Sequence, residues 1–454
     1  MSAMRNIFSI FVCFFMLSAP GIGAAETTTF TTTDDTRRVP VPPHDYSADP
    51  LLVLQGGTLI DGTGAAPITD ALVALRGDRI MYAGTAAGAG VSTEEGQVID
   101  TSGLYIVPGL IDLHVHFTQQ RGNFTRYRDS DAASAIRGVL LLGQLADAGV
   151  TTVRDVGTSN DVALRIKEAV ERRMVDGPRV LWSGNMISAK GGHADEITST
   201  ATGKPKSLAG SSRVRVANGP WDWRLAVREQ LRKQADWIKL TSPYTREEVT
   251  AAVDEAHMQG IPVTVDSFGK YTEWASEAGV DSIEHPLNMD EHIIAVMARN
   301  KTDFVPTLTA FYNVEKTGYP SAGIPSGGFF FTFARRYPVV HAQHLEMVGL
   351  AHKSGIRIGV GSDIPFENDV RYPQDYYVDL GLLKDAGLSD EDVFASATRV
   401  GAEILRMEDK LGTLEAGKLA DILVVGSNPL EDIQNLQDVK LVVADGRVIR
   451  DFTE

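Results

Sequence analysis

Cysteine is almost absent from this sequence: Cys13 is the only one among 454 residues. It lies in an apolar N-terminal segment, so a chain cleaved after that segment has no thiol at all. This absence excludes a disulfide framework and thiolate metal ligands, and it leaves His, Asp, Glu or a modified Lys to bind any metal. Stability must therefore come from a large hydrophobic core, for which the chain is long enough.

Positive charge is the second shortage. The chain has 43 Lys and Arg against 59 Asp and Glu, which gives a formal net charge of −16, and the basic residues form no cluster. Nucleic acid and anionic membrane surfaces are therefore not expected as partners. We expect a small-molecule substrate as the partner, and association into a homo-oligomer is left open.

Long hydrophobic runs are confined to the N-terminus. Arg5 precedes the apolar residues 7–17, and small residues follow up to Ala25. This layout is typical of a cleavable secretory signal and is short for a membrane span, with a retained N-terminal anchor as the alternative. We predict a signal peptide over 1–25, a flexible Thr- and Pro-rich segment over 26–49, and a secreted or periplasmic mature protein without stable membrane insertion.

The two ends of the remaining chain resemble each other and differ from the middle. Short β-type runs separated by Gly-rich turns occupy 50–107 and 412–454, which predicts one small β-sandwich domain built from both termini. Residues 108–411 alternate apolar runs of strand length with amphipathic helical stretches. Eight such units without a Gly-rich dinucleotide turn favour an α/β fold of the (β/α)₈ TIM-barrel type over a doubly wound sheet.

Ionisable side chains close several apolar runs in the alternating region. They are His114, His116, Lys239, Asp266, His285 and Asp363. Because reactive groups in a barrel lie at the carboxyl ends of the strands, we expect them all at one mouth. Burying such a cluster without a counterion is costly, and a divalent cation resolves it. Imidazole and carboxylate together suit one or two Zn²⁺ ions, with Mn²⁺ or another first-row ion as alternatives.

Each of these residues also has an ordinary interpretation when it is taken singly. A lone His is usually hydrogen-bonded in the core, a Lys usually forms a salt bridge, and Asp363 can cap the segment that follows it. Only their joint placement at successive strand ends favours the metal site. Arg154 is predicted to form a structural ion pair near the mouth. The other histidines expected on the surface are His44, His257, His292, His341, His344 and His352.

Several long motifs appear in a familiar order. GLYIVPGLIDLHVHF, TTVRDVG, GVDSIEHP and GSD resemble strands 1, 2, 6 and 8 of the metal-dependent amidohydrolase superfamily. The tail LGTLEAGKLADILVVGSNPLEDI is similar to the return of that family's chain into its β domain. The resemblance is to the imidazolonepropionase-related branch, which includes Xaa-Pro dipeptidases, ochratoxin-type amidases and imidazolone hydrolases.

This resemblance implies a ligand set. His114, His116 and Asp363 would hold the more buried ion, and Lys239, carboxylated by CO₂, would bridge two metals. The family usually has His at the end of strand 5, where this sequence has Asp266 in IPVTVDSFG. Asp266 would bind the second metal directly or through water and favour harder ions, or it would weaken that site so that one ion remains.

The resemblance also implies hydrolysis, by a metal-bound hydroxide, of an amide-type C–N bond in a small N-acyl amino acid or Xaa-Pro-like dipeptide. Asp363 would act first as base and then as acid. His193, in the GGHAD motif of a long loop over 188–220, would stabilise the oxyanion or bind substrate. Tyr244 would bind a substrate carboxylate or only pack in its loop. The alternatives are a cyclic amide or lactone hydrolase and, outside enzymes, a non-catalytic metal or solute binder.

Overall fold

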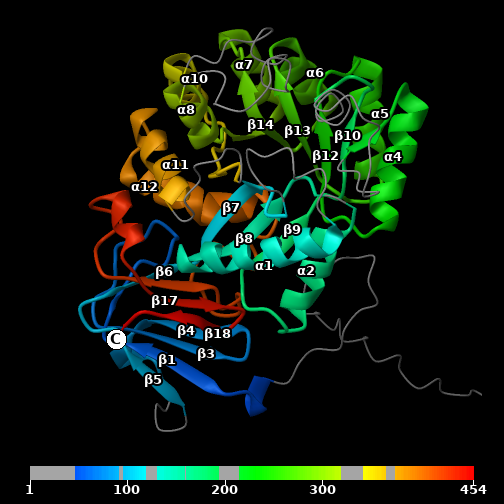
Figure 1. Ribbon diagram of the computed structural model, residues 1–454. Coiled ribbons are helices and arrows are strands. Elements are labelled where there is room, and N and C mark those ends of the chain that lie inside the picture. The colour runs from blue at the N-terminus through cyan, green and yellow to red at the C-terminus, as the bar shows by residue number, and fades with distance from the viewer. Residues whose placement is uncertain are drawn as a thin grey trace, which may run out of the picture. The chain divides into compact units, whose positions relative to one another are not determined.

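The computed structural model describes residues 46–90, 96–118, 130–158, 160–193, 214–317, 341–364 and 374–453 (Figure 1). The predicted signal peptide, the flexible segment up to residue 45 and most of the loop over 188–220 lie outside the described residues. His44 lies outside them as well. Within the described part of the chain, no helix is both long enough and apolar enough to cross a bilayer.

Two β-sheets are built from the two ends of the described chain (Figure 1). The first has the order β4-β3-β1-β5, and the second has the order β18-β17-β16-β6-β2, so the second sheet joins strands from both ends. The strands of the first sheet are β1 (Leu51–Gln55), β3 (Ala71–Arg76), β4 (Arg79–Thr85) and β5 (Gln97–Asp100). Those of the second are β2 (Thr58–Leu59), β6 (Tyr105–Pro108), β16 (Ile422–Val425), β17 (Val439–Ala444) and β18 (Arg447–Asp451).

Alternation of side chains explains how these two sheets pack. Leu52 and Leu54 in β1 lie in the same buried cluster as Val73 in β3, Ile106 in β6 and Val424 in β16. Residues two apart in a strand point to the same face, so each sheet contributes every second residue to a common core. The strand pairing between β6 and β16 brings the two ends of the chain into one layer.

The middle of the chain forms parallel sheets. One has the order β7-β8-β9, and the other has the order β11-β10-β12-β13-β14-β15. All of their strand pairs are parallel. The strands are β7 (Leu110–Val115), β8 (Val150–Asp155), β9 (Arg179–Trp182), β10 (Met186–Ser188), β11 (Val214–Val216), β12 (Ile238–Thr241), β13 (Val263–Phe268), β14 (Ser282–Leu287) and β15 (Asp303–Val305).

Residues 356–364 connect the edges of these two sheets. This segment is the predicted eighth strand, and the structure gives it bridges rather than a full strand. The Gly359 N–H donates to the carbonyl of Phe304 in β15, and the Val360 carbonyl accepts from Leu113 in β7. On the opposite edge, the Trp182 carbonyl of β9 accepts from the two N–H groups that precede β12. The described backbone therefore forms an α/β fold. Residues 356–364 link the β15 edge of one parallel sheet to the β7 edge of the other, and the segment before β12 links the larger sheet to β9.

Helices follow the parallel strands and cover them. The helices are α1 (Asp131–Asp147), α2 (Val162–Glu171), α4 (Pro220–Arg232), α5 (Arg246–His257), α6 (Lys270–Ala278), α7 (Glu291–Asn300), α8 (Leu308–Thr317), α10 (His341–Lys353), α11 (Gln374–Asp385), α12 (Asp390–Ala397) and α13 (Arg399–Ile404). Side-chain caps begin α1, α5, α7 and α12; in α5 the Thr245 hydroxyl accepts from the Glu248 N–H in a capping box. Short 3-10 turns cover η1 (Tyr46–Ala48), η2 (Ala86–Gly88) and η5 (Ile433–Gln437).

One surface prediction is wrong. His344 in α10 is buried, with 4% of its surface exposed, and its ring packs near Phe304 and Phe311. Helical spacing in the sequence shows that the α10 histidines share a helix but not which face meets the sheet. In the structure His344 lies on the face that also carries Val348 and Ala351, both of which are fully buried.

Candidate metal centre

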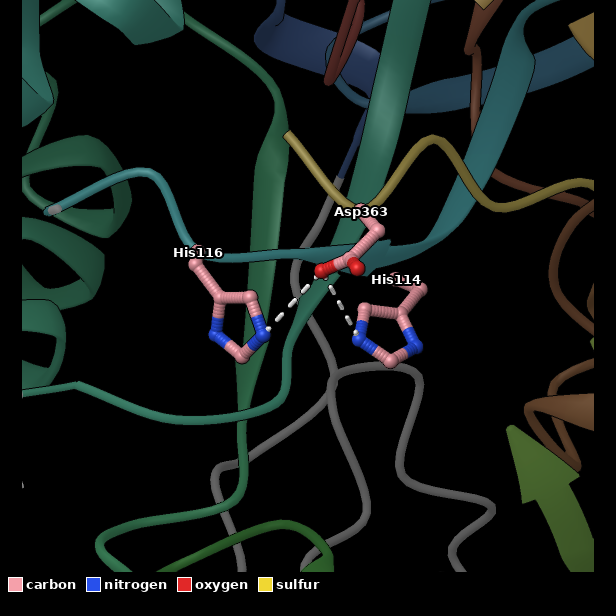
Figure 2. Close-up of side chains that lie close together, drawn as sticks. All are labelled: His114, His116 and Asp363. Atoms are coloured by element: carbon pink, nitrogen blue, oxygen red, sulfur yellow. Dashed lines mark ion pairs between the residues drawn. The ribbon is translucent and has the colours of Figure 1, made fainter. Parts of the chain in front are cut away.

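The first part of the site is built where β7 ends. His114 and His116 are two residues apart in an extended segment, so their side chains lie on the same side. The Asp112 carboxylate accepts hydrogen bonds from the N–H groups of His114 and Ser362, each at 3.1 Å. The Asp363 N–H donates to the His114 carbonyl at 2.7 Å. These bonds place Asp363 opposite the two histidines, as Figure 2 shows.

The Asp363 carboxylate lies between the two imidazoles (Figure 2). Its Oδ1 atom is 3.4 Å from Nε2 of His114 and 3.4 Å from Nε2 of His116. The ligand atoms of these three residues all lie within 4.8 Å of one another. Two ligands at about 2.0–2.2 Å from one tetrahedral zinc ion are about 3.4 Å apart. The spacing therefore fits a shared metal ion better than direct charge-assisted hydrogen bonds, which are about 2.7–2.9 Å long.

The opposite edge of each imidazole is held by an oxygen acceptor. Nδ1 of His114 lies 2.6 Å from Oε2 of Glu284, and Nδ1 of His116 lies 3.0 Å from the Gly157 carbonyl. An acceptor at Nδ1 places the imidazole hydrogen there and leaves the Nε2 lone pair available. Both histidines therefore present Nε2 towards the position that a metal ion would take.

A second pair of ligand groups lies beside the first. Nε2 of His285, in β14, is 3.4 Å from Oδ1 of Asp266, in β13. Nδ1 of His285 is 3.2 Å from the Thr307 hydroxyl, and its ring centre is 5.0 Å from that of His114. Burial alone would raise the pKa of Asp266, but the neighbouring imidazoles hold it well below its ordinary value. The arrangement repeats the spacing of the first set.

His193 contacts the second pair of ligand groups. Its Nδ1 lies against Oδ2 of Asp266. Its backbone is fixed at both polar groups, since the His193 N–H donates to the Ser242 carbonyl at 3.0 Å and its carbonyl accepts from the Thr241 hydroxyl at 3.2 Å. The loop histidine is therefore attached to the carboxyl end of β12 and to the predicted cluster.

Lys239, in β12, is buried with 2% of its surface exposed. Among the residues that the structure describes, none forms a hydrogen bond with its Nζ atom. Burial lowers the pKa of this amine, while the carboxylates of Glu284, Asp266 and Asp363 oppose that effect. A buried amine without a partner is costly, so this position fits a side chain that is completed by a further group.

Tyr244 is buried among aromatic side chains. It is 4% exposed, and its hydroxyl donates to the Tyr271 carbonyl at 3.0 Å. Its ring packs edge-on against those of Trp223 and Tyr271. These contacts show how the Tyr244 side chain packs, and its binding of a substrate carboxylate stays a prediction.

Sequence reasoning missed two acidic residues that organise the site, Asp112 and Glu284. Both are fully buried in strands, and a charged residue inside an apolar run was the signal that could have revealed them. The unusual backbone of the site could not be predicted from the residue types. His285 and Asp363 have positive φ angles of 36° and 52°, a region that residues other than glycine adopt infrequently. This local irregularity lets Glu284 and His285, although adjacent, both reach the cluster.

Comparisons with known proteins show which family the chain belongs to. The profile of the amidohydrolase family matches residues 105–449. A crystal structure of a Xaa-Pro dipeptidase with bound methionine is 29% identical, covers 88% of this chain and 100% of its own, and superposes with a TM-score of 0.79. Ochratoxinase of Aspergillus niger is 24% identical over 86% of this chain and 84% of its own. Imidazolonepropionase of Rhizorhabdus wittichii is 25% identical over 81% of this chain and 94% of its own. The chain therefore belongs to the amidohydrolase family and is a hydrolase of carbon–nitrogen bonds.

Proposed function

We propose that this protein is a metal-dependent hydrolase that cleaves an amide-type C–N bond in a small N-acyl amino acid or Xaa-Pro-like dipeptide. The observation that carries the proposal is the repeated spacing of 3.4 Å between an imidazole Nε2 and a carboxylate oxygen, at three positions. The similarity to a Xaa-Pro dipeptidase over the whole of that chain supports the substrate class.

The fold that we propose around this site is a (β/α)₈ barrel with a β-sandwich. The support is that residues 356–364 hydrogen-bond to both β15 and β7, which closes the parallel strands on that side. In such a barrel the carboxyl ends of the strands carry the reactive groups, and the candidate ligands all lie there. The sandwich consists of the two sheets that share one core.

The residues present fit one or two divalent ions. His114, His116 and Asp363 would hold the first, and Asp266 with His285 would contribute to a second. Lys239, deprotonated and carboxylated by CO₂, would bridge them as a carbamate, which replaces an unpartnered ammonium by two oxygens that share one negative charge. The imidazole and carboxylate donors suit Zn²⁺, and the anionic Asp266 also suits Mn²⁺.

The metal would supply Lewis acidity and lower the pKa of a water molecule. The chain's own residues then move the proton and orient the groups. Asp363 accepts the proton of the attacking water and passes it to the leaving nitrogen, so the C–N bond breaks with a neutral amine as product. His193 lies next to Asp266 and is the candidate for stabilising the developing oxyanion.

The decisive experiment is a substrate panel on enzyme reconstituted with Zn²⁺ or Mn²⁺ in the presence of bicarbonate. We expect turnover of Xaa-Pro dipeptides or N-aroyl amino acids, and the Asp363→Asn variant should keep part of its metal while losing at least 100-fold in kcat, roughly the contribution of general acid–base catalysis. The surface variant His292→Asn is the control. Substantial activity in Asp363→Asn would refute the role of Asp363.

The panel also separates the alternatives. Hydantoins and lactones test the second candidate, a cyclic amide or lactone hydrolase, which the similarity to imidazolonepropionase supports. Metal-loaded protein without turnover on any compound would point to a non-catalytic binder. The number of metal ions bound per chain, measured for the wild type and for Asp266→His, tests the role of Asp266. One ion in the wild type and two in Asp266→His would mean that the Asp266 carboxylate does not bind the second ion. The proposed location of the mature protein is outside the cytoplasm, as the N-terminal signal predicts.

A further inference from the structure

A buried ion pair lies directly behind the candidate metal centre. Arg154 in β8 and Glu284 in β14 are both fully buried, and Nη2 of Arg154 donates to Oε1 of Glu284 at 2.6 Å. The same Oε1 accepts from the hydroxyls of Ser282 and Thr264. Breaking such a pair would leave an uncompensated charge in the core, and Glu284 also contacts the candidate metal ligand His114.

Arg154 is held in one orientation by every nitrogen of its guanidinium. Nε donates to the Leu113 carbonyl at 2.7 Å, and Nη1 donates to the Ser282 hydroxyl at 3.1 Å. The guanidinium carbon lies 4.4 Å from the centre of the Trp237 ring. Because guanidinium has only donors, the group facing it must be an acceptor, and this fixes Oε1 of Glu284 on the Arg154 side.

The second carboxylate oxygen of Glu284 faces the site. Oε2 lies 2.6 Å from Nδ1 of His114, on the ring edge opposite Asp363. Nδ1 of His116 meets a backbone carbonyl and Nδ1 of His285 meets a hydroxyl, so Glu284 is the charged partner among these three contacts. A carboxylate is an acceptor only, and the hydrogen between Oε2 and the ring must therefore sit on Nδ1.

We infer that Glu284, oriented by Arg154, is a positioning residue that sets the tautomer of His114 and so keeps its Nε2 lone pair directed at the metal. The inference rests on the proposed function, because it concerns the affinity of the centre for its ion. Partners of this kind contribute about 10- to 100-fold to metal affinity. Neither Arg154 nor Glu284 touches the reacting atoms.

Glu284→Gln is the sharpest perturbation because it changes charge and donor pattern but hardly changes shape. Facing Arg154, the amide must present its oxygen there and its NH₂ group to His114. The ring must then accept at Nδ1 and carry its hydrogen on Nε2, which removes the ligating lone pair. We expect Zn²⁺ to bind 10- to 100-fold more weakly, as measured by competition with a chromophoric chelator. Ser282→Ala removes one contact to Glu284 and one to Arg154 but leaves the Arg154 Nη2–Glu284 and Glu284–His114 contacts in place, so Zn²⁺ affinity should stay within about threefold of the wild type.

The double variant Arg154→Met/Glu284→Gln separates positioning from simple damage. Without the guanidinium the amide is free to turn its oxygen to Nδ1, so the double variant should bind Zn²⁺ at least fivefold more tightly than Glu284→Gln alone. A merely structural role predicts that the double variant is no better than the single one. Unchanged affinity in Glu284→Gln, or absence of rescue in the double variant, would overturn the inference.

A further pair of variants covers the case in which Glu284→Gln does not fold. Arg154→Met/Glu284→Gln and Arg154→Met/Glu284→Leu both lack the buried charges, but only the first retains an acceptor for Nδ1 of His114. The Leu version should bind Zn²⁺ at least tenfold more weakly, and equal affinities would contradict the inference. Wild-type protein that binds no Zn²⁺ would instead contradict the proposed function, so the two failures are distinguishable.

Discussion

The buried imidazole of His344 predicts a specific loss of stability in acid. Neither ring nitrogen has a hydrogen-bond partner within the residues that the structure describes, and burial lowers its pKa from 6.5 to about 3. The folded state therefore holds the neutral ring, whereas the unfolded chain takes up a proton below its ordinary pKa. Stability from this group is present above pH 6.5 and is lost as the pH falls from about 6.5 to about 3.

The size of the effect follows from the proton affinity of the unfolded chain. At pH 5 the unfolded imidazole is about 1.5 pH units below its pKa, which corresponds to about 2 kcal/mol of lost stability. At pH 7 the loss is close to zero. Replacing His344 by Leu removes the titrating group and two unpartnered nitrogens, so the variant should be at least as stable as the wild type at pH 7. Between pH 7 and pH 5 its free energy of unfolding should fall by about 2 kcal/mol less than that of the wild type.

Urea unfolding at pH 5, 6 and 7 measures this difference. A chelator in every sample prevents metal binding from contributing to the pH dependence. His292→Leu is the matched control because it removes an imidazole that is 68% exposed on α7, and it should retain the wild-type pH dependence. If His344→Leu loses as much stability between pH 7 and pH 5 as the wild type does, the ring is not held neutral by burial and the reasoning fails.

Three further changes test the site. Gly361→Ala places a Cβ 2.8 Å from Cβ of His114 and 2.5 Å from Cγ1 of Val305, so the Zn²⁺ affinity measured by titration should fall about tenfold. The control is Gly143→Ala, whose Cβ meets only the end of a flexible arginine side chain and should leave the Zn²⁺ affinity unchanged. Tyr244→Phe should cost about 1–2 kcal/mol in urea unfolding while KM changes less than twofold; a large rise in KM would show that the hydroxyl binds substrate after all. Lys239→Met should stabilise the metal-free protein by about 1–3 kcal/mol but abolish any stimulation by bicarbonate, and a stimulation that persists in the variant would exclude the carbamate.

Local patterns predicted the parts of the fold that depend on neighbours in the chain. Short apolar runs between Gly-rich turns located strands, as in 51–55 and 422–425, and the longer amphipathic stretches located helices such as α5. The resemblance to the amidohydrolase superfamily, which rests on the motif around His114 and His116, is confirmed by the family profile. Barrel closure and the metal ligation of each residue stay predictions that the experiments above address.

Contacts across the fold escaped the sequence because they depend on which strand faces which. Nothing local distinguishes His344, buried in its helix, from His352 in the same helix, since both have polar neighbours. Glu284 was overlooked beside His285, because the positive φ of His285 is not encoded by a glycine. Tyr244 lies five residues beyond Lys239, and only the structure shows that its hydroxyl donates to the Tyr271 carbonyl on another element.

The sequence by itself determined the kinds of element, the family and the set of donor atoms, because periodicity and residue chemistry are properties of short stretches of chain. Only the tertiary structure decided which donors meet at 3.4 Å, that Asp266 lies between His193 and His285, and that an interior Arg154–Glu284 pair stands behind His114. The physical reason is that hydrogen-bond direction and burial are set by side chains brought together from distant strands, and those distances are not written in any local pattern.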